Sequence, residues 1–273
     1  MRVGFIGLGS QGGPMARRIV DAGIETVLWA RRPESLEPYA ETAAKVVGSP
    51  AELGAASDVV CLCVVGDDDV LQVTTGSDGV LSGMSEGGII VVHSTVHPET
   101  CRQLAQIAEA KGVSVVDAPV SGGGRAAAAG SLLVMVGGDD ESVASCRRVF
   151  ETYADPIVHL GPLGSGQVTK LLNNALFTAN LATASDTLDL GRSLSVDATR
   201  LAEVITHGTS NSFALERIAD AGGSLDRIAA YAGNLLQKDV GLLEGISSDV
   251  RGTTGEAVLA AAHDTLRRIG VES

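Results

Sequence analysis

The sequence has 273 residues, which is enough for one large domain or two ordinary ones. Apolar residues make up 45% of it and charged residues 19%, so a folded globular protein is expected rather than a disordered one. The net charge is −13 and no basic run occurs, which argues against a nucleic-acid partner. No apolar run reaches the roughly 18–20 residues of a membrane span.

The four cysteines, Cys61, Cys63, Cys101 and Cys146, have neither the spacing of a zinc site nor that of a disulfide framework. Cys61 and Cys63 lie in the apolar run VVCLCVV, where small buried side chains are expected. A strand is expected from Arg2 onward, so no targeting segment is expected ahead of the fold. These features favour a protein of the reducing cytoplasm.

A glycine-rich turn, GLGSQG, lies between an expected strand at residues 2–6 and an expected helix at 14–22. G-x-G-x-x-G in this context is typical of dinucleotide binding. Gly7 permits the tight turn, Gly9 admits a pyrophosphate and Gly12 lets the helix pack closely. The alternative is a glycine turn without a ligand. We expect a cofactor to be bound by the whole turn: Gly7, Leu8, Gly9, Ser10, Gln11 and Gly12.

The next expected strand, residues 26–29, ends in Ala30, Arg31 and Arg32. An NAD enzyme usually has a carboxylate here to bind the ribose 2′-hydroxyl. A guanidinium can instead bind a 2′-phosphate, so the sequence favours NADP over NAD, with NAD left possible. The alternative is that both arginines simply begin the next helix in solvent.

Strands and helices alternate through the first half of the chain, with strands at 57–65, 88–92, 113–116, 131–136 and 156–159 and helices at 67–74, 98–111 and 141–153. This alternation predicts an α/β fold with a Rossmann-like, doubly wound parallel sheet. Ligands bind at the carboxyl ends of such strands. Val64, Val65 and Thr95 lie at two of these ends, and we expect them to face the cofactor.

The loop after the strand at 113–116 reads DAPVSGG. Ser121, Gly122 and Gly123 present main-chain N–H groups with little side chain in the way. Successive N–H groups of this kind form an anion-binding nest. The alternative is a flexible glycine loop.

The second half of the sequence is expected to be all helical, with helices at 165–194, 197–207, 212–221, 235–248 and 256–269. The segment 161–164, GPLG, marks a boundary. We therefore expect a cofactor domain at 1–162 and a helical substrate and dimerisation domain at 163–273, joined by the long helix. That helix is apolar on nearly all sides and is expected to be buried.

Lys170 and Asn174 share one face of this long helix, and Asn173 lies beside them. A lysine near the start of a buried helix is either a catalytic group or a side chain that snorkels to solvent. Lys238 and Asp239 form a second polar pair in an apolar helix.

Three stretches, GFIGLGSQGGPMARRI, DAPVSGG with AGSLLVMVGG, and GSGQVTKLLNN, resemble in order and spacing the β-hydroxyacid dehydrogenase family. This family includes 3-hydroxyisobutyrate dehydrogenase, tartronate semialdehyde reductase and, more distantly, 6-phosphogluconate dehydrogenase. The resemblance covers nearly the whole chain. It implies an NAD(P)-dependent enzyme that interconverts a small β-hydroxy acid and its semialdehyde or oxo acid, as a dimer or tetramer formed through the helical domain.

The resemblance also implies residue roles. Lys170 matches the catalytic general acid/base, Asn174 a substrate-side asparagine, and Asn173 its neighbour. The other matches are Ser121, Gly122 and Gly123 for the substrate carboxylate, Thr95 for the cofactor, and Lys238 near both ligands.

The chain departs from the family at Gln11, where Met is usual, at Ala30, where Asn often precedes the arginine, and at Ala126, where Gly is usual. Arg125 beside Ala126 can change which acids fit. The alternatives to this enzyme class are an imine reductase, which generally has another residue in place of Lys170, and a cofactor-binding scaffold without catalysis.

Overall fold

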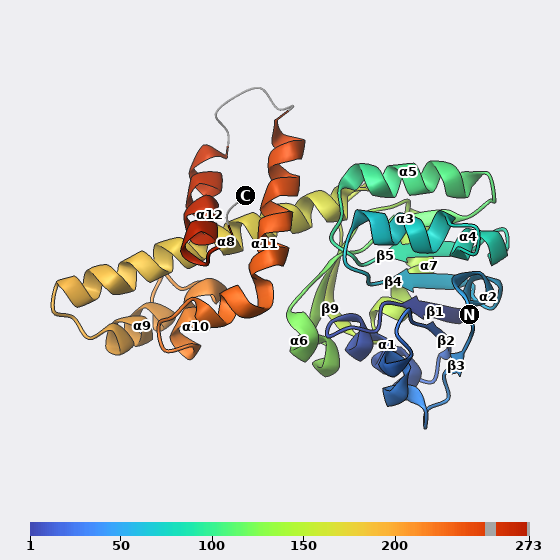
Figure 1. Cartoon of the computed structure of the whole chain (residues 1–273), viewed down its shortest axis with the longest axis horizontal. Helices are drawn as coiled ribbons and strands as arrows, with labels where there is room; N and C mark the ends of the chain where they lie inside the picture. Colours follow the sequence, from blue (N-terminus) through green and yellow to red (C-terminus); the bar gives the residue numbers. More distant parts are fainter. Residues whose placement is uncertain (249–254, 272–273) are drawn as a thin grey trace. The chain divides into compact units, whose positions relative to one another are not determined.

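The computed structural model describes residues 1–248 and 255–271. The chain divides into two compact units, Met1–Lys170 and Leu171–Ser273 (Figure 1). Each unit has apolar clusters of its own, formed by strands and helices in the first and by helices alone in the second. The units are described in turn.

The first unit is built on a six-stranded parallel sheet of order β3-β2-β1-β4-β5-β6. This is the strand order of doubly wound dinucleotide-binding folds, so the predicted fold class is confirmed. The strands are β1 (Arg2–Ile6), β2 (Glu25–Trp29), β3 (Lys45–Val46), β4 (Val59–Leu62), β5 (Ile89–Val92) and β6 (Ser114–Asp117).

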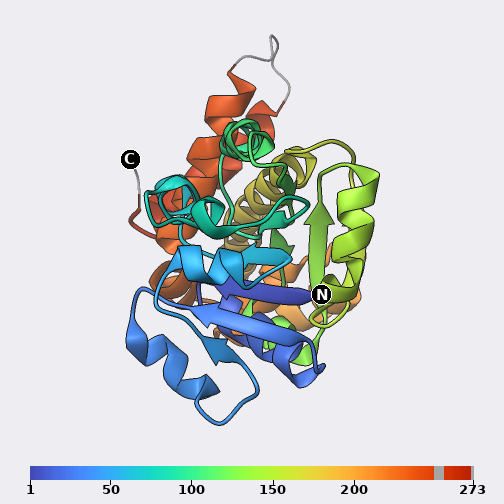
Figure 2. The same cartoon turned by 90° about the vertical axis from the view of Figure 1, so that its right-hand side faces the viewer.

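Helices cover both faces of this sheet (Figure 2). Strand side chains alternate between faces: Phe5 and Cys61 pack toward α1 and α7, whereas Ile6 and Leu62 pack toward α2 to α5. The covering helices are α1 (Gly12–Asp21), α2 (Pro50–Ala55), α3 (Asp67–Thr75), α4 (Val80–Gly83), α5 (Pro98–Glu109) and α7 (Asp140–Phe150). Burial on both faces explains why the strands read as continuous apolar runs.

The last strands of this unit form a separate sheet, which the sequence analysis did not predict. It has the order β7-β8-β9, with β7 (Val120–Ser121) antiparallel to β8 (Leu132–Val136) and β8 parallel to β9 (Ala154–His159). Only the short helix α6 (Gly123–Ala129) separates β7 from β8. That connection is too short for a parallel crossover, so the two strands pair antiparallel.

Some short elements also escaped prediction: β3, β7, α2, α4 and the 3-10 helix η1 (Pro33–Tyr39). Helix α2 had a readable start signal. Ser49 caps it by accepting a hydrogen bond from the N–H of Glu52, and Pro50 occupies its first position.

The second unit contains the helices α9 (Ala198–His207), α10 (Phe213–Asp220), α11 (Asp226–Ser247) and α12 (Glu256–Arg268), together with most of α8 (Ser165–Ser193). Its core is formed by residues such as Leu181, Leu188, Ile218, Val240 and Leu266. Helix α11 begins nine residues before the predicted 235–248 because Gly233 lies inside it, close to Val271, and does not break it.

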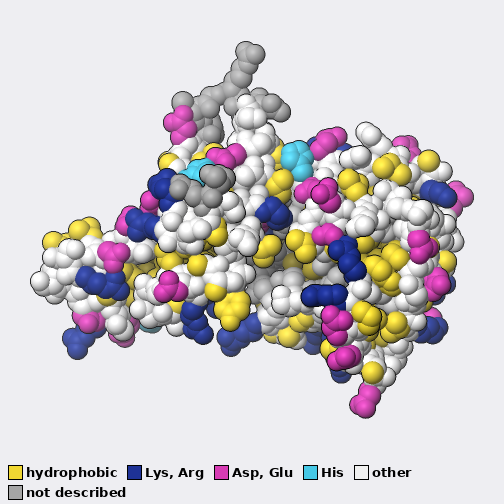
Figure 3. Space-filling model, in the orientation of Figure 1, with side chains coloured by type: hydrophobic (Ala, Val, Ile, Leu, Met, Phe, Trp, Pro, Cys, Tyr) yellow, Lys and Arg dark blue, Asp and Glu magenta, His cyan; other side chains and the backbone are white. Residues whose placement is uncertain are grey.

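The expectation that α8 is buried all round was wrong. Leu171, Ala175 and Leu181 are buried, but Leu172 and Leu176 are 53% and 55% exposed. Apolar side chains reach the surface among charged ones (Figure 3). The apolar composition of α8 therefore includes a face that the described chain leaves exposed.

The first turn of α8 is held on strand β6 by Asp117. The N–H of Gly164 donates to Asp117 Oδ1 at 2.6 Å, and the N–H of Gln167 donates to Oδ2 at 2.7 Å. These are N–H groups that a helix start leaves without intrahelical partners, and the helix dipole favours a carboxylate there. A Cβ on Gly137 would lie 2.3 Å from Asp117 Oδ1, so only glycine leaves room for this contact.

Burial raises the pKa of Asp117 from 3.8 to about 6, although the N–H donors of Gly164 and Gln167 act in the opposite direction. Because the folded pKa is above the unfolded one, this group stabilises the fold most below pH 3.8 and loses that contribution as the pH rises through about 6. The full difference corresponds to about 3 kcal/mol.

We therefore expect the free energy of unfolding of the wild type, relative to Asp117→Asn, to fall by up to about 3 kcal/mol between pH 4 and 7. Urea unfolding of both proteins across this range measures the difference. Subtracting the free energy of unfolding of the variant from that of the wild type cancels the contributions of the other carboxyl groups to the pH dependence. A difference that is constant or grows with pH would show that the pKa of Asp117 is not raised.

Candidate active site

The turn between β1 and α1 has the geometry that its glycines predict. Gly7 has a φ of +98°, and a Cβ there would lie 2.2 Å from the carbonyl oxygen of Cys63. A Cβ on Gly12 would lie 2.0 Å from the Gly7 carbonyl oxygen. A Cβ on Gly9, by contrast, would meet no described protein atom within 4 Å. Packing explains why Gly7 and Gly12 are glycines. No described protein contact requires glycine at position 9, where the sequence predicts the close approach of a pyrophosphate.

The carboxyl ends of β1, β4 and β5 bring the other expected cofactor residues to the same edge. The N–H of Cys63 donates to Ile6 O, and the N–H of His93 donates to Leu62 O, both at 2.8 Å. Val64, Val65 and Thr95 directly follow these strand ends, and Val65 is 70% exposed. The sheet thus provides an apolar surface beside the glycine turn.

Arg31 and Arg32 both lie exposed after β2. The guanidinium of Arg31 is 2.8 Å from Asp69 Oδ1 and 3.3 Å from Gln72 Oε1, both on α3. Arg32 precedes the first residue of η1. Sequence spacing around β2 could not reveal Asp69, because this carboxylate comes from a helix 38 residues further along.

The loop after β7 packs against the dinucleotide turn. Gly122 and Gly123 have φ values of +127° and +74°. A Cβ on Gly124 would lie 2.3 Å from the carbonyl oxygen of Ser10. The backbone of the expected carboxylate loop, which begins at Ser121, therefore lies directly beside the turn expected to bind the cofactor.

A buried histidine supports the start of this loop, and the sequence analysis missed it. His93 Nδ1 lies 2.6 Å from the carbonyl oxygen of Ala118, and Nε2 lies 3.1 Å from the hydroxyl of Tyr153. Burial lowers the pKa of His93 to about 4. A neutral ring that donates from Nδ1 to Ala118 and accepts at Nε2 from Tyr153 satisfies both contacts.

Lys170 lies in the second turn of α8 and is 9% exposed, so its exposure does not fit a side chain that snorkels to solvent. One turn before it, Gln167 is fully buried. Gln167 Nε2 donates to the carbonyl oxygen of Ser94 at 2.8 Å, and Gln167 Oε1 accepts from the N–H of Val96 at 3.0 Å. Gln167 stands in the GSGQVTKLLNN stretch but had no predicted role.

The second unit brings three predicted residues into one network through Asp239, which is 4% exposed. Asn174 Nδ2 donates to Asp239 Oδ2 at 2.6 Å, and Lys238 Nζ lies 3.0 Å from Asp239 Oδ1. Asn173 Nδ2 donates to Asn174 Oδ1 at 3.1 Å. The buried carboxylate thus fixes the orientation of the Asn174 amide.

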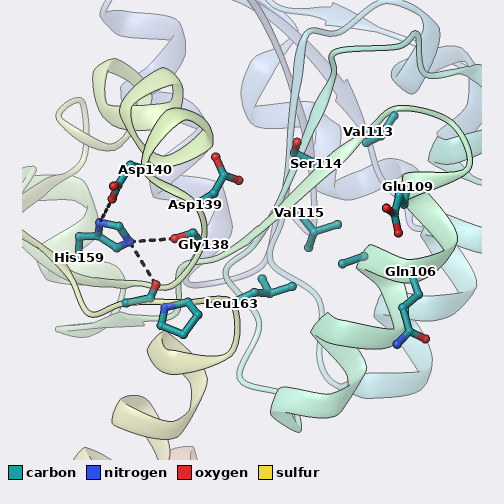
Figure 4. A pocket seen from close by; sticks show the side chains of 13 residues that line it. Gln106, Glu109, Val113, Ser114, Val115, Gly138, Asp139, Asp140, His159 and Leu163 are labelled. Carbon is teal, nitrogen blue, oxygen red and sulfur yellow. Dashed lines mark hydrogen bonds and ion pairs between the residues drawn. The ribbon is translucent and has the colours of Figure 1, made fainter.

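A pocket in the first unit is lined by residues of α5 and β6 and by the segments around Gly138 and His159 (Figure 4). His159 lies on one side of it, with Nε2 at 3.0 Å from Gly138 O and Nδ1 at 3.5 Å from Asp140 Oδ1. Glu109 and Ser114 lie on the other. None of the predicted site residues lines this pocket.

In the part of the chain that the structure describes, no three His, Cys, Asp or Glu side chains are grouped to hold a metal ion. No helix of this part is long and apolar enough to cross a membrane.

Two family models match the chain. Residues 2–161 match the NAD binding domain of 6-phosphogluconate dehydrogenase. Residues 164–267 match the NAD-binding domain of NADP-dependent 3-hydroxyisobutyrate dehydrogenase. Together the two matched segments include every site residue described above.

Individual proteins agree with these models. The chain is 33% identical to a 3-hydroxyisobutyrate dehydrogenase of Pseudomonas aeruginosa, over 94% of this chain and 89% of that protein. The structure of the Mycobacterium tuberculosis 3-hydroxyisobutyrate dehydrogenase with L-serine superposes with a TM-score of 0.86 at 27% identity, covering 99% and 94% of the two chains. Psf3 in complex with NADP+ and 2-OPP gives a TM-score of 0.84 at 25% identity, covering 97% and 93%.

A Streptomyces aurantiacus imine reductase shares the fold, with a TM-score of 0.69 at 19% identity and coverage of 96% and 93%. At this identity the likeness concerns the fold alone. The two family models and the Pseudomonas relative are more specific, because they match both halves of the chain in sequence. The chain therefore belongs to the β-hydroxyacid dehydrogenase family and is an NAD(P)-dependent oxidoreductase that acts on CH–OH groups.

Proposed function

We propose that the protein interconverts a small β-hydroxy acid and its semialdehyde or oxo acid, with NADP as the preferred cofactor and Lys170 as the general acid/base. The observation that carries this proposal is the burial of Lys170 in a helix whose start is fixed at the same sheet edge as the glycine turn. The named relatives support 3-hydroxyisobutyrate or a similar short acid as the substrate.

In the direction of oxidation, Lys170 Nζ accepts the proton of the substrate hydroxyl while a hydride leaves the carbon that bears this hydroxyl. NADP+, when bound, supplies the hydride acceptor. The carbon–oxygen bond becomes a carbonyl, so the substrate loses one proton and one hydride. In the reverse direction, Lys170 returns the proton to the oxygen.

The remaining predicted residues hold the substrate. Ser121 and the N–H groups of Gly122 and Gly123 bind its carboxylate in this proposal, because consecutive N–H groups suit an anion. Asn174 orients the substrate hydroxyl, supported by its hydrogen bonds with Asn173 and Asp239. The second of these bonds ties Asn174 to the same carboxylate that pairs with Lys238.

The remaining assignments rest on the sequence. We propose a cofactor domain at residues 1–162 and a substrate and dimerisation domain at 163–273. We also propose a cytoplasmic location, which the four free thiols support. An imine reductase is the second candidate because of the shared fold, and the presence of Lys170 argues against it and against an inactive scaffold. Turnover of cyclic imines but not of hydroxy acids would favour the imine reductase.

We expect Lys170→Ala to lower kcat for 3-hydroxyisobutyrate oxidation by about 10²–10⁴-fold, the usual contribution of a general acid/base. NADPH binding, followed by fluorescence, is expected to stay within a few-fold of the wild type. Thr169→Val is the matched control, because Thr169 lies in the same turn and hydrogen-bonds only to Ser165 O among the described contacts. Full turnover by Lys170→Ala would contradict the assignment.

Arg31→Gln is expected to weaken NADPH binding by tenfold or more and to leave NADH binding unchanged, because only NADPH has a 2′-phosphate for the guanidinium to bind. Asp69→Asn removes a carboxylate that competes for Arg31. An exposed ion pair is worth about 0.2–1 kcal/mol, so NADPH binding should tighten by about 1.4–5-fold. Equal effects on both cofactors would refute the role of Arg31.

We also propose a homodimer formed through the helical unit. Its support is a set of large apolar side chains that are exposed in this unit: Leu172, Leu176, Leu190, Leu194, Val196, Val204, Phe213, Tyr231 and Leu235. Leu172 and Leu176 lie four residues apart on α8 and share a face, and exposed apolar patches often mark protein–protein interfaces.

The double variant Leu190→Glu/Leu194→Glu is expected to be monomeric, because each carboxylate would have to be buried at the interface. Light scattering after size-exclusion chromatography gives the mass of variant and wild type. Val46→Glu is the control, because Val46 is 55% exposed in the first unit. A monomeric wild type would refute the dimer, and an unaltered dimer in the double variant would refute this interface.

A further inference from the structure

The side chain of Gln167 makes two hydrogen bonds to the main chain of the loop after β5, one on each side of Thr95. Its side-chain amide donates to the carbonyl oxygen of Ser94 and accepts from the N–H of Val96. These two main-chain groups flank Thr95, which is predicted to contact the cofactor. The side-chain amide of Gln167 therefore fixes the main chain on both sides of Thr95, with one hydrogen bond before this residue and one after it.

The main chain of Gln167 is held independently, by the hydrogen bond from its N–H to Asp117 Oδ2. Strand β6 thus fixes the backbone of this residue, and the loop after β5 fixes its side chain. The hydroxyl of Ser94 also accepts from the N–H of Val64 at 2.8 Å, which extends the network to the end of β4. Gln167 is fully buried, so water does not replace a lost partner and each unmade bond is costly.

Gln167 and Lys170 are three residues apart in α8 and are neighbours on the helix surface. A helix turn is stiff because its main-chain hydrogen bonds fix its dihedral angles. Fixing Gln167 relative to Thr95 therefore fixes the backbone of Lys170 relative to Thr95. In the proposed reaction a proton leaves the hydroxyl oxygen and a hydride leaves the carbon that bears it. The two acceptors must therefore be placed together, and a misplacement of about 1 Å can cost about 10²-fold in rate.

We propose that Gln167 is a positioning residue, which holds the proton-transferring Lys170 in register with the cofactor loop at Thr95. This inference rests on the proposed function of Lys170. Gln167 itself contacts neither the substrate nor the cofactor. It affects the rate by fixing the position of Lys170 on helix α8 relative to Thr95 in the loop after β5.

Two substitutions separate positioning from simple packing. Gln167→Met keeps the length and volume of the side chain but removes both hydrogen bonds. Gln167→Glu keeps the shape, and when protonated it restores both bonds, because its O–H donates to Ser94 O and its other oxygen accepts from the N–H of Val96. When the glutamate of this variant is ionised, it has no proton to donate to the Ser94 carbonyl oxygen, so that hydrogen bond is lost. Burial disfavours the ionised form of such a carboxyl group.

We expect Gln167→Met to lower kcat by tenfold or more and to change NADPH affinity by less than threefold. The kcat of Gln167→Glu, divided by that of the wild type at the same pH, is expected to rise as the pH falls from 8.5 to 6. The same ratio for Gln167→Met is expected to stay constant. The titratable groups next to Gln167 are Asp117 on β6, Cys101 on α5 and Lys170 on α8, and all three are present in every protein compared.

The outcomes distinguish this inference from the proposed function. Wild-type kcat in Gln167→Met, or a Gln167→Glu ratio that does not depend on pH, would overturn the positioning role even if Lys170→Ala is inactive. An active Lys170→Ala would instead overturn the proposed function. Thr169→Val is the control for a change in the same turn and is expected to keep the wild-type kcat. Near-UV circular dichroism checks folding, and the pH-dependent recovery of Gln167→Glu is a test that a misfolded protein would fail.

Discussion

The buried carboxylate of Asp117 is the interaction on which the arrangement of the first unit depends. It lies at the end of β6 and accepts hydrogen bonds from the first turn of α8, while the main chain of Asp117 pairs with Gly137, the residue that follows β8. One residue therefore joins the parallel sheet, the small sheet and the start of the long helix. Desolvation of this carboxylate is unfavourable, and its N–H donors offset part of that cost.

Glycines make the close contacts around this centre possible. Gly137 gives Asp117 its space, Gly12 lets α1 approach the dinucleotide turn, and Gly124 lets the second glycine loop contact Ser10. Any side chain at these positions would overlap main-chain or carboxylate oxygens. The loops expected to bind the cofactor and the substrate carboxylate are thus packed against each other through backbone atoms.

The two units use buried polar groups in the same way. In the first, Asp117 and Gln167 determine where the beginning of α8 lies, and His93 supports the loop at Ala118. In the second, Asp239 orients Asn174 and pairs with Lys238. In each case a side chain outside the predicted set is hydrogen-bonded to a segment that contains predicted residues. Such groups are retained although burying them is costly, because their partners satisfy them.

The sequence by itself determined the α/β class, the glycine turn, the two-part organisation and the family, because these depend on local periodicity and on motifs of consecutive residues. Gly7 and Gly12 could be assigned from their spacing alone. The tertiary structure decided what long-range contacts determine: the separate sheet of β7 to β9, the carboxylate of Asp69 beside Arg31, and the hydrogen bonds of Gln167 on both sides of Thr95. Each of these joins residues distant in sequence, and hydrogen-bond partners across such distances leave no periodic signal in the chain.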